Sequence, residues 1–275
     1  MGDQVEDHEE ASDVVSVRER NHVQVTGEGP VIVFAHGFGC DQRMWRHVAP
    51  RFAADHTVVL FDYVGSGRSD RASYDPVRYG SLDGYATDLL EVLDAVGSER
   101  AAFVGHSVSA NVGIIAALRE PARFEQLVLV APSPRFIDDP PYVGGSSAGD
   151  IEVLLDLMDQ NFMGWARALS TMAAPDPSIA DELDTSFCAT DPAVIRQFAD
   201  VAFMADTRQL LPLVRVPTLV VQCTDDVLVP VSVGEYLHEH IQGSRYALVD
   251  AVGHMPHMSV PDIVEREIRA FLAAA

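Results

Sequence analysis

Apolar runs of strand length alternate with helical patterns along most of this 275-residue chain. Most of the runs are nearly continuous in apolar residues, which is typical of strands covered on both faces. From Leu82 to Val96, apolar residues recur at offsets of three and four, as on one buried helix face. Strand–helix–strand repetition requires right-handed crossovers, so the sequence predicts an α/β fold with a mostly parallel sheet flanked by helices. The expected strands are residues 23–26, 31–35, 57–61, 101–105, 127–130, 217–223 and 246–249.

The first two expected strands are separated only by Gly27, Glu28, Gly29 and Pro30. A short linker that contains glycine and proline favours a turn between neighbouring strands. We therefore expect residues 23–26 and 31–35 to enter the sheet as a pair.

The alternation of strands and helices stops between residues 133 and 213. Helical patterns lie around residues 151–162, 165–172 and 194–203, and no convincing strand lies among them. An insertion of this size over the carboxyl ends of parallel strands would form a cap. The sequence therefore predicts a core domain from residues 21–132 and 214–275 and a helical cap from residues 133–213.

The formal net charge of the chain is −22. Such a charge disfavours binding to nucleic acid and to anionic membranes, and it favours a monomer. Residues 1–20 are rich in Asp and Glu and have almost no large apolar side chains. Burial then cannot offset the entropy of ordering this segment, so we expect residues 1–20 to form a mobile acidic tail.

Three cysteines, Cys40, Cys188 and Cys223, have irregular spacing and form no C-x-x-C pair. This pattern indicates neither a disulfide framework nor a zinc site. The sequence also lacks a P-loop, an H-E-x-x-H helix and a calcium loop, so we expect no metal and no cofactor. The acidic N-terminus and the absence of an apolar stretch of about 18 residues predict a cytoplasmic protein without a membrane span.

A serine stands between an apolar strand and a helix of small residues, in the sequence Gly105-His106-Ser107. In this context a sharp turn lifts the Ser107 hydroxyl off the end of the sheet, where a base and a substrate can reach it. A serine hydroxyl is a poor nucleophile at neutral pH and needs a base, and the base needs a third group to orient it. Ser107 is therefore the predicted nucleophile of a serine hydrolase.

Candidates for the base and the acid follow later expected strands, in the chain order Ser, Asp, His that this architecture uses. His254, which follows a glycine, is the preferred base. His257 is the alternative base, and if His254 is the base, we expect His257 to stand at a helix entry or to support the site. Asp225 and Asp226 follow the strand at 217–223, and either can supply the acid.

The glycine-containing loop at residues 36–39 directly follows the expected strand at 31–35. The backbone N–H groups of Phe38 and Val108 could aim two donors at one carbonyl oxygen and form an oxyanion hole, while His36 is expected to be structural. Apolar cap residues must pack against each other or face a cavity over the serine. The expected substrate pocket is lined by Phe38, Phe136, Phe162, Trp165 and Phe203.

Several short segments together resemble one family of α/β hydrolases. They are residues 34–41, 61–67, 82–85, 105–108, 132–134, 138–141 and 253–258. These segments look like those of the RsbQ-like bacterial stress regulators, to which the plant karrikin and strigolactone receptors are similar. The resemblance extends from about residue 20 to the C-terminus and includes both the core and the cap.

The resemblance implies an α/β-hydrolase core, a V-shaped cap of four helices and a buried apolar pocket over the serine. Carried onto this chain, it makes Ser107 the nucleophile, His254 the base and Asp226 the acid, with Phe38 and Val108 as oxyanion donors. One departure is Ser109, which stands where the family has a glycine two residues after the nucleophile.

The resemblance also implies a signalling role, in which the protein activates a PAS-domain phosphatase that switches on a general-stress sigma factor. The sequence therefore predicts a serine hydrolase acting on a small apolar ester or lactone, with this phosphatase as a partner. Two alternatives stay open: a ligand sensor with slow or incidental hydrolysis, and an ordinary metabolic carboxylesterase.

Overall fold

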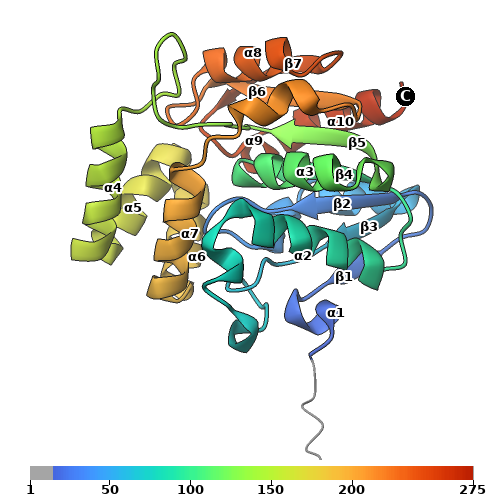
Figure 1. Cartoon of the computed structure of the whole chain (residues 1–275), viewed down its shortest axis with the longest axis horizontal. Helices are drawn as coiled ribbons and strands as arrows, with labels where there is room; N and C mark the ends of the chain where they lie inside the picture. The colour runs from blue at the N-terminus through green and yellow to red at the C-terminus, as the bar shows by residue number, and fades with distance from the viewer. Residues whose placement is uncertain (1–14, 275) are drawn as a thin grey trace, which may run out of the picture.

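The structure of the protein, a computed structural model, describes residues 15–274. Seven strands form one sheet, helices lie on both of its faces, and four further helices stand beyond one end of the strands (Figure 1). The predicted α/β fold with a mostly parallel sheet and a helical cap is confirmed.

The sheet has the strand order β1-β3-β2-β4-β5-β6-β7. Strand β1 is antiparallel to its neighbour, and every other pair of adjacent strands is parallel. The strands are β1 (Gln24–Thr26), β2 (Val31–Ala35), β3 (Thr57–Leu60), β4 (Ala101–His106), β5 (Phe124–Val130), β6 (Thr218–Asp225) and β7 (Arg245–Val252). All seven lie where the sequence predicts them, to within a few residues.

The pairing predicted for the first two strands is wrong, because β1 pairs with β3 and not with β2. The linker between β1 and β2 passes close to the chain that leads into β3. A Cβ on Gly27 would lie 2.3 Å from the carbonyl oxygen of His56, and one on Gly29 would lie 2.5 Å from that of Asp55. The two glycines therefore allow the linker to cross β3 and place β2 on its other side.

Helices α2 and α3 lie on one face of the sheet, and α10 lies on the other (Figure 1). The stripe predicted from Leu82 to Val96 forms α2, whose apolar side packs against the core. The core helices are α1 (Val17–Arg20), α2 (Leu82–Ala95), α3 (Val108–Arg119), α8 (Val231–His240), α9 (Pro256–Ser259) and α10 (Pro261–Leu272). Short 3-10 helices cover Gln42–Trp45, Ala49–Ala54, Arg71–Ser73, Arg78–Gly80, Pro121–Arg123 and Arg208–Leu213.

The predicted acidic tail covers residues 1–20, of which residues 1–14 lie outside the described part of the chain. Within the described part, Val17–Arg20 is helical rather than extended. The Arg20 guanidinium forms ion pairs with two carboxylates of α2, one of them the buried Asp88. The folded part therefore begins before the predicted boundary, because Arg20 binds to the core.

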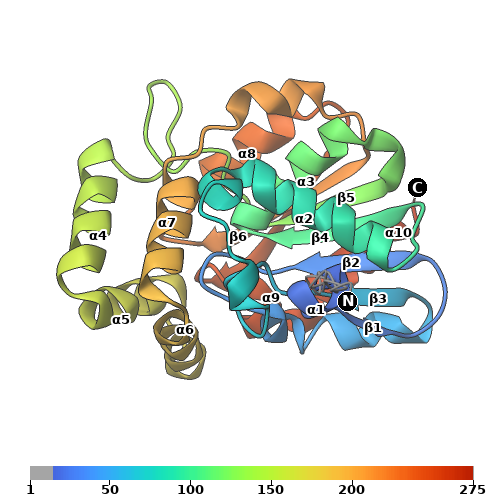
Figure 2. The ribbon, with the colours of Figure 1, turned by 60° about the horizontal axis from the view of Figure 1, so that its bottom comes forward.

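The cap consists of α4 (Ala148–Gln160), α5 (Phe162–Ala173), α6 (Pro177–Ala189) and α7 (Pro192–Phe203). Figure 2 shows these helices as a separate group beside the sheet domain. The sequence patterns predicted α4, α5 and α7 and missed α6, although a cap of four helices agrees with what the family resemblance implies. In the described part of the chain, no helix combines the length and the hydropathy needed to span a bilayer.

Candidate active site

Ser107 stands at the sharp turn between strand β4 and helix α3. Its backbone has φ +53° and ψ −120°, a conformation that costs a non-glycine residue about 1–3 kcal/mol. The N–H of Ser107 donates to the carbonyl oxygen of Val130 at 2.9 Å and so ties the turn to strand β5. Ser107 lines a cavity between the sheet and the cap. This strand–turn–helix geometry is the one that exposes the serine of a G-x-S motif.

The position after the turn accommodates a serine where the family has a glycine. Ser109 is fully buried, and its hydroxyl donates to the carbonyl oxygen of His36 at 2.5 Å. Its oxygen also lies 2.8 Å from the hydroxyl of Tyr63, which can donate to it. The extra polar atom thus has both of its partners, so the departure from glycine leaves no unsatisfied group in the turn.

Ser107, His254 and Asp226 form one hydrogen-bonded line. The Ser107 Oγ lies 2.8 Å from Nε2 of His254, and Nδ1 of His254 lies 2.7 Å from Oδ2 of Asp226. Because an ionised carboxylate only accepts hydrogen bonds, Nδ1 carries the proton of a neutral imidazole and Nε2 accepts from the serine hydroxyl. The structure therefore brings together the three residues that the sequence selected from far-separated segments.

The carboxylate of Asp226 is held in place by its own loop. Oδ1 accepts hydrogen bonds from the N–H groups of Leu228 at 2.9 Å and Val229 at 3.1 Å, which leaves Oδ2 for His254. The alternative residue, Asp225, has an exposed side chain. Its carbonyl oxygen accepts from the N–H of Gly253 at 2.7 Å, so its backbone braces the loop that carries the histidine. Of the two candidates, only Asp226 contacts the imidazole.

The alternative base, His257, lies in α9 behind the line of three residues. Its ring is fully buried between Trp45 and His106, with centroid distances of 4.4 and 4.5 Å. Within residues 15–274, neither of its ring nitrogens has a hydrogen-bond partner. Burial, and then the charges of His254 and Arg46, lowers the pKa of His257 to about 3. His257 is therefore a neutral packing residue and does not contact the serine.

The loop expected to supply an oxyanion donor follows strand β2. Nε2 of His36 accepts from the N–H of Tyr63 at 3.1 Å, so Nδ1 carries the proton and donates to the carbonyl oxygen of Gly37 at 2.9 Å. These bonds fix the loop, which agrees with the structural role predicted for His36. Phe38 and Val108 line the same cavity as Ser107. As the first residue of α3, Val108 has an N–H without a partner inside the helix.

The cavity over Ser107 is apolar and small, about 40 Å³. On this measure a water molecule needs about 10–15 Å³, so the cavity has room for a few waters. Three of the five predicted pocket residues line it, namely Phe38, Phe136 and Phe203. The apolar lining also includes Leu169, Leu183 and Phe187.

The pocket roles predicted for Phe162 and Trp165 are wrong, since neither residue lines the cavity. The Trp165 ring is fully buried and packs behind Phe38 and Phe187, with centroid distances of 6.2 and 5.5 Å. Phe162 stacks on the far side of Trp165 at 5.4 Å. These two rings form an outer layer that supports the lining. Leu183 and Phe187 were missed because they belong to the unpredicted helix α6.

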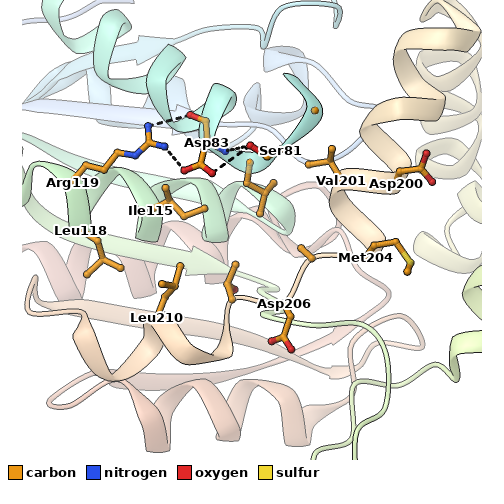
Figure 3. A pocket seen from close by; sticks show the side chains of 14 residues that line it. Ser81, Asp83, Ile115, Leu118, Arg119, Asp200, Val201, Met204, Asp206 and Leu210 are labelled. Carbon is orange, nitrogen blue, oxygen red and sulfur yellow. Dashed lines mark hydrogen bonds and ion pairs between the residues drawn. The ribbon is translucent and has the colours of Figure 1, made fainter. Parts of the chain in front are cut away.

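A larger hollow of about 810 Å³ lies on the outside of the molecule, between the start of α2 and the connection after α7. Figure 3 shows Arg119 and Ser81 directed at Asp83, whereas the carboxylates of Asp200 and Asp206 lie apart from this group. Neither Ser107 nor His254 lines this hollow. The smaller cavity is the candidate active site, because it holds Ser107 together with the imidazole of His254 at hydrogen-bond distance. Within residues 15–274, no group of three or more His, Cys, Asp or Glu side chains is arranged to hold a metal ion.

A family model described as "Alpha/beta hydrolase family" matches residues 32–267. The chain belongs to this family. A rice protein (Oryza sativa subsp. japonica) described as a probable esterase is 41% identical over 254 residues, which cover 90% of this chain and 94% of the rice protein. "Karrikin insensitive 2 receptor CA" of Petunia hybrida is 36% identical over 253 residues, covering 90% and 94% of the two chains. The solved structure of a hydrolase from Oleispira antarctica has a TM-score of 0.92 and 39% identity, and covers 96% of this chain and 100% of its own.

These relatives confirm the predicted resemblance of this α/β hydrolase to the plant karrikin and strigolactone receptors. The narrower resemblance to the RsbQ-like stress regulators stays a prediction. Because the matches cover nine-tenths or more of both chains, the similarity includes the cap as well as the sheet domain.

Proposed function

We propose that this α/β hydrolase is a serine hydrolase that cleaves a small apolar ester or lactone. The observation that carries the proposal is the line of hydrogen bonds from Ser107 through His254 to Asp226. In the first step, Oγ of Ser107 attacks the carbonyl carbon of the substrate while Nε2 of His254 takes the hydroxyl proton. Asp226 stabilises the imidazolium that forms and keeps its ring in the reactive orientation.

The attack converts the carbonyl oxygen into an oxyanion, which needs hydrogen-bond donors. We assign this role to the N–H groups of Phe38 and Val108, and the N-terminal end of helix α3 adds a favourable dipole. Loss of one such donor typically raises the barrier by about 3–4 kcal/mol. Collapse of the intermediate breaks the bond to the leaving oxygen, which receives the proton from His254. Water, activated by His254, then releases the acid and restores Ser107.

The lining and the small volume of the cavity favour a substrate with an apolar and compact acyl group. Its walls are mostly aromatic and aliphatic side chains, and its polar lining residues are Ser107, His254 and His106, together with the thiol of Cys40. A volume of about 40 Å³ holds only a few waters, so any ester or lactone requires the lining side chains or the cap helices to move outward, and a larger acyl group requires more movement. We therefore expect short-chain aryl esters and small lactones to be the better substrates.

A fluorophosphonate probe tests the nucleophile directly, because it reacts covalently with an activated serine. The wild-type protein should be labelled on Ser107, as located by peptide mass spectrometry, and hydrolysis of an aryl acetate should stop. The variant Ser107→Ala should show neither labelling nor hydrolysis, whereas Ser178→Ala, at an exposed cap residue that does not line the cavity, should behave as wild type. Equal labelling of the wild type and Ser107→Ala would contradict the proposal.

The relatives favour a second candidate function, since one of them is named as a receptor. In this alternative, hydrolysis is slow or incidental, and a ligand held over or attached to Ser107 changes the cap surface so that a partner binds. The partner predicted from the resemblance is a PAS-domain phosphatase of a stress-signalling pathway. Near-stoichiometric product with an aryl ester, together with ligand-dependent capture of such a phosphatase, would support the sensor. Turnover of many substrate molecules per second without capture would support a metabolic carboxylesterase.

A further inference from the structure

The ring of His106 lies beside that of the proposed base, with a centroid distance of 4.9 Å, and it also lines the cavity over Ser107. His106 is the last residue of strand β4 and only 2% exposed. Its Nε2 lies 2.8 Å from the carbonyl oxygen of His254, although the two residues are 148 positions apart in the sequence. Because a carbonyl oxygen only accepts, Nε2 of His106 carries the proton and donates to the backbone of His254.

The surroundings of His106 keep its ring neutral and fixed. Burial, and then the repulsion that protonated His257 and His254 rings would exert, holds the pKa of His106 well below its usual value. Its other nitrogen, Nδ1, has no hydrogen-bond partner within residues 15–274. A Cβ on Gly37 would lie 2.4 Å from this nitrogen, so the glycine leaves space for the ring. The buried ring thus makes one hydrogen bond, and that bond goes to the residue that carries the base.

The opposite side of the same residue is held by the cap. The N–H of His254 donates to the carbonyl oxygen of Ala173, the last residue of α5, at 2.7 Å. The backbone of the base is therefore fastened on one side by the core, through His106, and on the other by the cap, through Ala173. The bond to Ala173 therefore couples the base to the cap, and the bond to His106 couples it to the sheet.

We propose that His106 is a positioning residue for the reaction, which anchors the backbone of His254 to the sheet so that Nε2 of the base stays directed at Ser107. The inference rests on the proposed function, because it assigns a support to the proposed base. A displacement of about 1 Å at a reacting group can cost about a hundredfold in rate. The anchor on the sheet does not depend on where the cap stands, whereas the bond to Ala173 does.

The test compares two buried histidines that lie side by side. His106→Phe keeps a ring of similar shape and removes the donor, and we expect kcat to fall 10-fold to 100-fold with KM changed less than about threefold. His106→Gln retains a donor near the position of Nε2 and should recover kcat to within about fivefold of the wild type. His257→Phe, at a ring without a hydrogen bond, should leave kcat within about twofold.

Thermal unfolding of each variant accompanies the kinetics. A wild-type kcat in folded His106→Phe would overturn the proposal. Equal losses in the Phe and Gln variants would also overturn it, because the ring would then matter for packing and not as a donor. If Ser107→Ala retains activity, the proposed function itself fails. If Ser107→Ala is inactive but His106→Phe has the kcat of the wild type, only the positioning role of His106 fails.

A measurement on the wild-type protein keeps the proposal testable if His106→Phe does not fold. Long-range ¹H–¹⁵N correlation spectra of labelled imidazoles, assigned with His106→Gln, report which nitrogen carries the proton. We expect the Nε2–H form of His106 and no protonation of Nδ1 between pH 5 and 9. A proton on Nδ1 instead of Nε2 would remove the donor and overturn the proposal.

Discussion

The side chain of Asn111 binds the hydroxyl of Thr207, with Oδ1 of the asparagine accepting at 2.8 Å. Nδ2 of the same side chain donates to the carbonyl oxygen of Ser133, also at 2.8 Å. Ser133 precedes the cap helices and Thr207 follows them, while Asn111 lies one turn after the proposed nucleophile in α3. One buried amide therefore fastens both connections of the cap to the helix that begins at Ser107.

We expect Asn111→Ala to lower the free energy of unfolding by about 1–3 kcal/mol, since it leaves the buried carbonyl group of Ser133 without its donor. The looser cap should also reduce the preference for short over long acyl chains. Urea unfolding and rates with a series of aryl esters measure the two effects. Thr207→Val, which removes only one of the bonds, should show a smaller loss of stability. An unchanged unfolding free energy in Asn111→Ala would argue against the fastening role.

Replacement of Asp226 tests how the base is oriented. Asp226→Asn should lower kcat by about 10⁴-fold, because an amide can turn its N–H₂ to Nδ1 of His254 and favour the wrong tautomer of the imidazole. Asp225→Asn, which changes an exposed neighbour, should lower kcat less than about threefold. Steady-state rates with one aryl ester compare the pair. Similar losses in both variants would mean that Asp226 does not have the special role proposed here.

The sheet could be predicted from the sequence because buried parallel strands leave a strong local signal. The runs that became β4, β5 and β6 are almost purely apolar, and two of them are followed by the polar residues Ser107 and Asp226. Parallel strands have their carboxyl ends at the same edge of the sheet. The position of each candidate residue directly after a predicted strand was therefore sufficient to place these residues near one another. The pairing of β1 with β3 leaves no such local signal in the sequence, because it depends on the path of the linker across β3.

The cap was harder to predict than the sheet, because the contacts of its helices link residues that are far apart in the sequence. In α6, the apolar residues Ile179, Leu183 and Phe187 recur at an offset of four, a helical signal that could have revealed this helix, and Asp176 followed by Pro177 marks its start. Whether an aromatic side chain lines the cavity depends on whether a side chain of another helix lies between it and the cavity. Trp165 was expected at the cavity and lies behind Phe187, a relationship that periodicity within α5 does not encode.

The stability of the protein should fall as the pH is lowered from about 6.5 toward 3, in part because of His257. Its pKa is lowered in the folded state to about 3, below the value of about 6.5 in an unfolded chain. Between these values the unfolded state binds a proton that the folded state does not, so the free energy of unfolding decreases with falling pH by about 1.4 kcal/mol per unit. Urea unfolding from pH 7 to pH 4 should show a shallower decrease in His257→Phe than in the wild type. Identical pH slopes would contradict the buried, neutral state of His257.

Enlarging the cavity should change which substrates are accepted. Phe187 is 3% exposed, lines the cavity and lies 5.9 Å from Phe38 between ring centroids. Phe187→Ala should increase kcat/KM for aryl esters with longer acyl chains at least tenfold relative to the acetate, because the lost ring leaves space beside Ser107. The same change should lower the free energy of unfolding by about 3–5 kcal/mol. Phe162→Ala, at a ring outside the cavity, should leave the chain-length preference unchanged while it weakens the packing on Trp165. A shift of preference in Phe162→Ala as large as that in Phe187→Ala would mean that the acyl group occupies a different part of the cap.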